Sequence, residues 1–240
     1  MKIQQQLTAV LFLGAPLTLL AGGNDVTLGG AGLGQAAFLA LSEDMGAAFS
    51  YKALAPIEPQ GTFGFDVGVE MGVTSVENAE VWQQVTGDDI SNIPVPRLHL
   101  HKGLPLDFDI AASYAKVPSS DISLFAWEVR YAFIAGDIAM PAVGVRYSQS
   151  NLSGIDDLSF STSAVELGIS KGFAMFTPYA GIGRVWVDSA PDVAGLVEEN
   201  ITLNKKFFGI NLNLGLFNMA LEHDTTGDAK TVGAKVSFRF

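Results

Sequence analysis

The sequence predicts an all-β protein: an antiparallel up-and-down transmembrane β-barrel of about ten strands, with eight to twelve allowed, and a short helical or irregular N-terminal plug. Three observations predict it. The last ten residues alternate apolar and polar side chains up to a terminal Phe240. The same two-residue period recurs from residue 62 onward. After residue 21, no apolar run approaches the roughly 18 residues of a membrane-spanning helix, so a membrane-embedded chain must close its sheet.

The composition agrees with one domain of moderate size. The chain has 240 residues, of which 48% are hydrophobic and 16% charged, and it contains 26 Gly. Cysteine is absent, which excludes disulfides, thiolate metal sites, a cysteine nucleophile and a lipoprotein anchor. The net charge of −11 argues against a nucleic-acid partner, because phosphates would be repelled.

The N-terminal region divides into two predicted segments. Residues 1–21 combine one early cation, Lys2, with an apolar run that Gly14 and Pro16 interrupt, so they predict a cleaved signal peptide and export; a buried N-terminal helix is the alternative. Residues 22–61 are predicted to plug the barrel or to lie in the periplasm, with Ala36–Leu41 as a short helix or a buried extended piece. The glycine-rich stretch before it lacks the third glycine of a dinucleotide-binding loop, where Gln35 stands.

Residues 62–240 are predicted to form the barrel. The alternating stretches are residues 63–73, 97–101, 108–114, 125–133, 143–148, 165–169, 174–188, 208–214, 219–222 and 231–240. Short turns near 104, 136, 172 and 216 alternate with longer polar loops at about 77–94, 117–121, 150–157, 189–203 and 224–230. This asymmetry predicts periplasmic turns, external loops and an aromatic girdle beside the turns. A soluble lipocalin-like barrel is the competing architecture, but its interior would have to be apolar.

The polar faces of these strands predict a lumen lined by acids and bases in near balance. A buried charge is costly unless it is paired, so the groups must form ion pairs or hold water. Two interpretations follow: a salt-bridged interior that holds the wall together, or a small selective pore or substrate path. The candidate lumen residues are Asp66, Glu70, Arg97, His99, His101, Asp107, Asp109, Glu128, Arg130, Arg146, Glu166, Arg184, Glu222, Lys235 and Arg239.

Catalytic and metal-binding patterns are scarce. His99 and His101 point the same way on a strand, a spacing that suits a metal, but no third ligand is evident. The motifs H-E-x-x-H and G-x-S-x-G and the phosphate-binding P-loop are missing. The sequence therefore predicts no catalytic residue, no cofactor, no metal site and no enzymatic activity.

Two stretches carry resemblances to bacterial outer-membrane barrels. The stretch Thr231–Phe240 resembles their closing strand, which implies that Phe238 and Phe240 are the signal recognised by the barrel-assembly machinery. The stretches His99–Pro105, Ser170–Gly181 and Gly183–Trp186 are similar to an uncharacterised family of Gram-negative outer-membrane barrel proteins. That resemblance covers most of the mature chain and implies the fold and the outer-membrane location, but no activity.

Two further resemblances are local. Gly32–Ala48 looks like the N-terminal hatch of the long-chain fatty-acid transporter family, although Lys52–Pro56 replaces the Asn-Pro-Ala that follows there; it implies only a plugged lumen. His223 and Asp224, together with Asp88 and Asp89, resemble the rim residues of omptin-type proteases, without that family's flanking motifs.

The sequence thus predicts a non-enzymatic outer-membrane barrel. The leading hypothesis is passive passage or binding of a small or hydrophobic molecule; the alternative is a structural barrel for envelope integrity, and an outer-rim protease is a remote third. The expected partners are outer-membrane lipid and lipopolysaccharide, the assembly machinery and a small or hydrophobic ligand. Acidic loops would bind divalent cations bridging to lipopolysaccharide phosphates, or simply be solvated.

Overall fold

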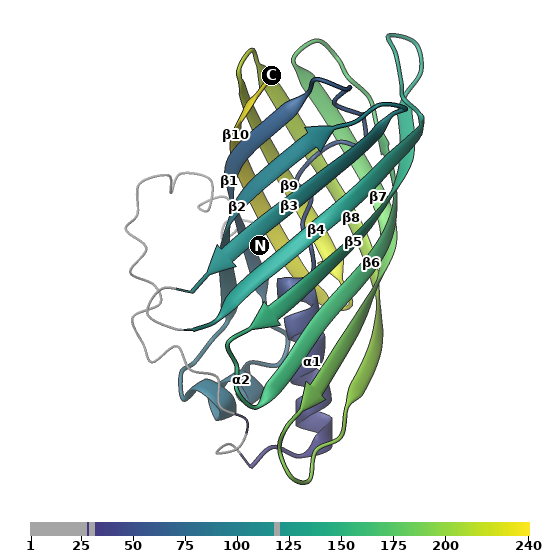
Figure 1. Ribbon diagram of the computed structural model, residues 1–240. Helices are drawn as coiled ribbons and strands as arrows, with labels where there is room; N and C mark the ends of the chain where they lie inside the picture. The colour runs from purple at the N-terminus through teal and green to yellow at the C-terminus, as the bar shows by residue number, and fades with distance from the viewer. Residues whose placement is uncertain (1–27, 29–31, 118–120) are drawn as a thin grey trace, which may run out of the picture.

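The computed structural model describes residues 28, 32–117 and 121–240. The predicted signal peptide, residues 1–21, lies outside these residues. Within them, ten antiparallel strands pair in chain order and β1 closes the barrel on β10 (Figure 1). The predicted all-β antiparallel barrel and its strand number are therefore confirmed. The same residues contain two helices, and neither has the length and hydropathy of a membrane-spanning helix.

The strands are longer than the alternating stretches from which they were predicted. The predicted loops at 150–157, 189–203 and 224–230 are present but shorter than predicted, because the connections there are only 154–157, 192–198 and 227–228. On β8, Asn200, Thr202 and Asn204 occupy exposed outward positions, so the ladder goes on where the apolar alternation stops. The strands are β1 Phe65–Ser75, β2 Asn92–Gly103, β3 Phe108–Lys116, β4 Ser123–Ile134, β5 Ala142–Ser153, β6 Leu158–Ser170, β7 Phe176–Pro191, β8 Glu199–Leu214, β9 Phe217–Thr226 and β10 Ala229–Arg239.

The two ends of the barrel differ. One end, called here the turn end, carries the connections 104–107, 135–141, 171–175 and 215–216 together with the C-terminus; it is at the top of Figure 1. The other, the loop end, carries the connections 76–91, 117–122, 154–157, 192–198 and 227–228. The loop-end connection between β1 and β2 contains helix α2, Ala79–Thr86, which the sequence analysis did not predict.

The distribution of side chains is the reverse of a soluble barrel. Leu98 and Phe208 are each 62% exposed on the outside, whereas Arg97, next to Leu98, and Lys205, three residues before Phe208, are 3% exposed on the inside. Hydrophobic side chains cover the outer wall toward the turn end and charged ones line the lumen there, which excludes the lipocalin-like alternative with its apolar interior and polar outside.

Aromatic side chains gather near the turn end, as predicted for an interfacial girdle. The ring pairs there are Phe108 with Tyr131 at 4.6 Å, Phe217 with Phe238 at 4.8 Å and Phe65 with Phe240 at 5.6 Å. Tyr179, which was expected in this girdle, instead points inward and is buried.

The lumen is occupied by the segment that precedes β1. Helix α1, Gln35–Phe49, lies in the loop-end half of the barrel, and residues 50–61 continue in extended form toward the turn end (Figure 1). Phe38, Leu41 and Met45 of α1 belong to an apolar cluster with Val187 and Leu203 of the wall. Residues 35–61 are called the plug below. The helix is longer than the predicted Ala36–Leu41, because small residues rather than a strong apolar stripe carry its second half.

Asp44 ties the plug to the loop-end connection that contains α2. Its buried carboxylate accepts hydrogen bonds from the backbone N–H groups of Glu77 and Asn78, each at 3.1 Å, and from Nε1 of Trp82 at 3.1 Å. Because Asn78 is the N-cap residue of α2, the carboxylate also lies at the positive end of that helix. One side chain of α1 therefore orders the connection between β1 and β2.

Replacing Asp44 with alanine is expected to release this connection. The substitution leaves three donors without an acceptor, a cost of about 2 kcal/mol, so amides of residues 77–82 should exchange with deuterium about 30-fold faster. Hydrogen exchange measured by mass spectrometry checks it. The matched control is Glu43→Ala, which truncates the exposed neighbouring carboxylate. Equal exchange protection of residues 77–82 in Asp44→Ala and in the control would show that Asp44 does not hold this connection.

Candidate functional site

The candidate site is the polar lumen, and strand register assembles it. Glu70 of β1 lies opposite Arg97 of β2 on one side and Lys235 of β10 on the other. Asp109 lies opposite Arg130, and Arg146 opposite Glu166. Opposite charges in directly paired positions stabilise a register, and a shift by one residue would turn them all outward. The predicted lumen residues that the structure buries inside are Asp66, Glu70, Arg97, His99, His101, Asp109, Glu128, Arg130, Arg146, Glu166, Glu222 and Lys235.

Two predicted lumen residues lie elsewhere. Asp107 is exposed in the turn before β3, where it and Leu106 adopt positive φ angles of 60° and 63°, so its side chain leaves the alternation. Arg184 is exposed on the outer wall, because it shares a face of β7 with Ile182 and Trp186. Arg239 is only partly buried at the turn end of the lumen, where its Nη1 lies 3.5 Å from Oδ1 of Asn213.

Three lumen charges were missed by the sequence analysis. Lys205 and Asp224 point inward from β8 and β9; Asp224 was assigned to a loop, and Lys205 lay between a predicted loop and the next predicted strand. Lys52 belongs to the plug and forms an ion pair with Asp224 at 2.9 Å. The alternation itself contained the signal for Asp224, which is two residues from the inward Glu222.

A turn-end cluster surrounds Arg130. Its guanidinium donates to Oδ2 of Asp109 at 2.8 and 3.1 Å, lies 2.8 Å from Nε2 of His101, and also donates to the carbonyl of Pro56. Gln60 of the plug completes the cluster, since its backbone N–H donates to Asp109 and its amide lies 2.9 Å from Nδ1 of His101. The wall and the plug are thus joined through one buried cation.

A second cluster centres on Glu70. Its carboxylate accepts from Nδ1 of His99 at 2.8 Å and pairs with Arg97 at 3.4 Å. The other ring nitrogen of His99 lies 3.3 Å from the hydroxyl of Tyr51, a plug residue. Arg97 also donates to the carbonyl of Ala48 at 3.0 Å.

A third cluster runs along β4 to β8. Glu166 pairs with Lys205 at 2.6 Å and with Arg146 at 3.5 Å, and Arg146 lies 3.7 Å from Glu128. The guanidinium of Arg146 sits 5.3 Å from the centre of the Phe207 ring, a cation–π contact.

The contacts between wall and plug follow one rule. Arg97, Lys205, Arg146 and Arg130 each donate to a plug carbonyl, namely that of Ala48, Tyr51, Ala55 and Pro56 respectively. The carbonyl of Ala48 lies in the last turn of α1 and the other three lie in the extended part of the plug, which has no ladder partner, so the wall cations satisfy them.

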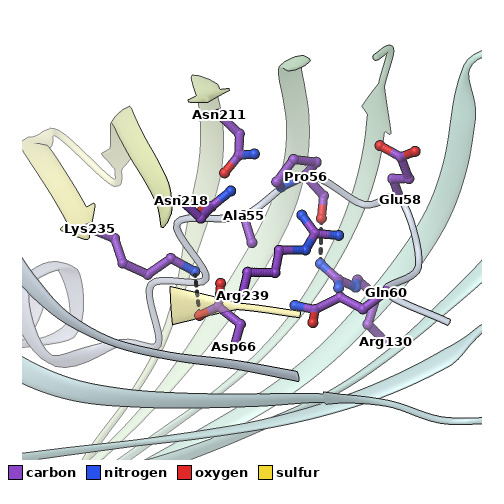
Figure 2. A pocket seen from close by; sticks show the side chains of 10 residues that line it. All are labelled: Ala55, Pro56, Glu58, Gln60, Asp66, Arg130, Asn211, Asn218, Lys235 and Arg239. Atoms are coloured by element: carbon purple, nitrogen blue, oxygen red, sulfur yellow. Dashed lines mark hydrogen bonds and ion pairs between the residues drawn. The ribbon is translucent and has the colours of Figure 1, made fainter. Parts of the chain in front are cut away.

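A small cavity remains beside the plug at the turn end. Figure 2 shows it between Pro56, Arg130, Arg239 and the Asp66–Lys235 pair, whose atoms are 3.6 Å apart. Its volume is ≈ 10 Å³, room for about one water molecule. The cavity is therefore a solvent site within the ionic packing and is too small for an organic ligand.

The geometry gives no support to the metal or protease patterns. His99 and His101 are engaged by carboxylate, phenol, amide and guanidinium groups, and in the described ranges no group of three or more His, Asp or Glu side chains is arranged to hold a metal. His223 and Asp224 point to opposite faces of β9, with His223 outside against Phe208 and Asp224 inside. They do not form a shared rim site.

Charge at the loop-end mouth is acidic. Partial burial raises the pKa of the Glu43 carboxyl above its ordinary value, and the nearby carboxylates of Asp228, Asp44 and Glu199 raise it further.

At the turn end, in the connection between β4 and β5, hydrogen bonds from the backbone N–H groups of Met140 and Ala139 lower the pKa of Asp137.

Comparisons with known proteins find distant structural similarity and no sequence match. No protein-family model matches the chain, and no curated protein matches its sequence. A loop-deletion mutant of OmpT, an outer membrane protein of Vibrio cholerae, aligns over 61% of this chain with a TM-score of 0.33 and 16% identity. The chain covers 54% of that protein, so it spans about half its length.

Two further solved structures align over more of the chain. They are the translocator domain of autotransporter NalP from Neisseria meningitidis (TM-score 0.39, 10% identity, 75% of this chain and 88% of that one) and Ail of Yersinia pestis (TM-score 0.29, 10% identity, 74% and 97%). These neighbours are outer-membrane β-barrel proteins. The likeness to fatty-acid transporters stays a prediction.

Proposed function

We propose that this protein is a non-enzymatic outer-membrane β-barrel that is closed by its own plug and that serves the integrity of the envelope. One observation carries the proposal: apart from Arg239 at the turn end, the charged wall side chains that point into the lumen are only 0–4% exposed. A water-filled pore would leave such side chains in contact with solvent. Here ion pairs and plug carbonyls take the place of that water.

The orientation in the membrane follows from the two ends. Bacterial barrels place short turns and both chain ends of the barrel at the periplasm, and longer loops outside. The turn end is therefore assigned to the periplasm and the loop end to the exterior. The plug then runs from outside, at α1, to the periplasm, at residue 61.

Gated passage of a small molecule is the second candidate, and the chemistry of the plug contacts favours it. Residues 50–61 are held by hydrogen bonds and ion pairs, such as Lys52 with Asp224, as well as by buried apolar side chains such as Leu54 and Ile57. Water can replace polar contacts of this kind at modest cost, so the extended part of the plug could move while the wall stays intact.

Conductance in planar bilayers tests the proposal. The full barrel is expected to insert without channel steps, whereas a variant that lacks residues 35–61 should show steady steps, because water then fills the vacated lumen. Heat-modifiable gel mobility of both proteins is the folding control. Steady conductance by the full barrel would overturn the closed state.

A crosslink distinguishes the second candidate. The chain has no native cysteine, so Lys52→Cys and Asp224→Cys can be joined by a short bismaleimide. Gated passage predicts uptake of a small solute into vesicles that the crosslink abolishes; uptake that survives the crosslink would count against movement of the plug.

A further inference from the structure

The outer wall has a groove that neither the plug nor the lumen explains. It lies across β6 to β9 with a volume of ≈ 770 Å³, and its lining includes Ile182, Arg184, Trp186, Asn204, Lys206 and Thr225. Arg184 and Lys206 are exposed on this outward face. Cations are unusual on this face, because apolar side chains cover the outer wall between the groove and the turn end.

A step in the height of the wall creates the groove. Strand β9 ends at Thr226, opposite Lys205, and the backbone N–H of Gly227 donates to the carbonyl of Asn204 at 2.9 Å. Beyond this level β7 and β8 continue together to Pro191 and Glu199. The short hairpin of β9 and β10 therefore leaves one side of the taller pair uncovered.

The groove lies at the height where the outer leaflet ends. On β8, outward residues are apolar from Leu214 to Phe208 and polar from Lys206 onward. The eight steps along the strand from Leu214 to Lys206 rise about 20 Å along the membrane normal, at about 3.3 Å each and a tilt of about 40°, against an apolar band of about 25 Å. A cation costs little at the interface and about 2–4 kcal/mol at the midplane, so this height suits Arg184 and Lys206.

Aromatic side chains occur in the groove and in the row of paired residues that leads away from it. Trp186 pairs with Ser163 in the register, Ser163 with Gln149, and Gln149 with Trp127. Trp127 lies edge-on to Tyr147 with ring centres 5.7 Å apart. Tryptophan and tyrosine collect where acyl chains meet headgroups.

The charges in the groove are unmatched. Arg184 pairs with Asn204 and Lys206 with Ile182 in the register, so the two cations are diagonal neighbours, on the order of 7–8 Å apart at the backbone. Neither forms an ion pair with any residue of the described chain, whose net charge is strongly negative. Asp188 follows on the same face of β7 beyond Trp186, and Lys230 adds a third outward cation opposite Thr225.

We propose that this groove binds the phosphorylated glycolipid of lipopolysaccharide, lipid A. Its phosphate would accept hydrogen bonds from Arg184 and Lys206, its sugar would contact Asn204 and Thr225, and its acyl chains would lie on Ile182 and the apolar wall below. The inference rests on the outer-membrane location and orientation proposed above. A glycolipid is favoured over a phospholipid because neutral amide and hydroxyl groups flank the cations, as a phosphorylated sugar requires.

Native mass spectrometry of the folded barrel in detergent, titrated with lipid A, tests the proposal. The double variant Arg184→Gln with Lys206→Gln is expected to bind lipid A about tenfold more weakly, because two charge-assisted contacts are lost. The charge-conserving exchange Arg184→Lys with Lys206→Arg should restore most of the binding. Lys116→Gln, an exposed cation at the loop end of β3, is the control and should bind as the original chain does.

Each other outcome counts against the site. Equal binding of phosphatidylglycerol would overturn the assignment to a glycolipid, and full competition by inorganic pyrophosphate would make the groove a free-anion site. Unchanged binding in the double variant would remove the groove altogether. Failure of the original chain to fold into lipid vesicles, seen by heat-modifiable gel mobility, would instead overturn the proposed function and is scored separately.

Discussion

Replacing Arg130 with methionine is expected to lower the free energy of unfolding by about 3–5 kcal/mol, because it leaves a buried carboxylate without its counter-ion. Asp109 is fully buried and takes two hydrogen bonds from this guanidinium. Its remaining contact with the plug is the backbone N–H of Gln60. The same substitution also removes the donor to the Pro56 carbonyl, so the turn-end part of the plug loses its main attachment.

Urea titration of the barrel in lipid vesicles, followed by heat-modifiable gel mobility, measures this loss. Lys116→Met, an exposed change on β3, is the control and should cost no more than about 0.5 kcal/mol. Adding Asp109→Asn to Arg130→Met should recover part of the loss, since the orphaned charge disappears. A single variant as stable as the control would show that water, and not Arg130, compensates Asp109.

Enlarging Gly46 is expected to push α1 away from the wall. A β-carbon at this position would lie 2.5 Å from Cγ2 of Val187 and 3.1 Å from Cδ1 of Leu203, and the valine is stiff about its first side-chain bond. Gly46→Leu should therefore cost about 3 kcal/mol, the upper range for overpacking. Displacement of α1 would also carry Asp44 away from Trp82.

Tryptophan fluorescence can follow that displacement in a chain that keeps Trp82 alone, with Trp127 and Trp186 changed to phenylalanine. A red shift of Trp82 emission, together with a lower urea midpoint, is the expected result. Gly34→Ser is the matched control, because a β-carbon there meets nothing within 4 Å and serine suits an N-cap position. An unshifted Trp82 in Gly46→Leu would mean that β7 and β8 yield instead of α1.

The sequence was sufficient for the barrel because alternation is strong wherever lipid-facing positions are apolar. It was also sufficient for most of the ionic lumen, since parity along a strand assigns Glu70, Asp109 and Glu166 to one face without knowledge of partners. Arg184 shows how the argument failed. Its parity matched Ile182 and Trp186, but it was placed inside because a charge was not expected among outward residues.

The loop-end halves of the strands could not be found by the same pattern. Where Asn200 and Thr202 face outward, Ile201 and Leu203 face inward, so the apolar side of β8 is reversed from outward to inward although the ladder continues. Lys205 and Asp224 fell within these stretches and were lost from the lumen set. Lys52 could not be placed at all, because no local period fixes the position of an extended segment within a barrel.

The pairing of opposite charges in the lumen could not be predicted from the alternation of the strands alone. The sequence predicted a nearly neutral set of lumen charges, but some of its members were wrong. Asp107 and Arg184 lie outside the lumen, and Asp224, Lys205 and Lys52, which were not predicted, lie within it. The total stayed close to zero because burial tolerates only compensated charges, whichever residues provide them.

The position of the plug ahead of β1 has a consequence for biogenesis. Residues 35–61 leave the ribosome before any strand of the barrel, yet in the folded protein the barrel that β1 and β10 close surrounds them. If β1 and β10 paired before residues 35–61 had entered, these residues would remain outside the lumen. The carbonyl groups of residues 35–61 would therefore have to bind Arg97, Arg130, Arg146 and Lys205 while the sheet is still open. The barrel would then close around this segment.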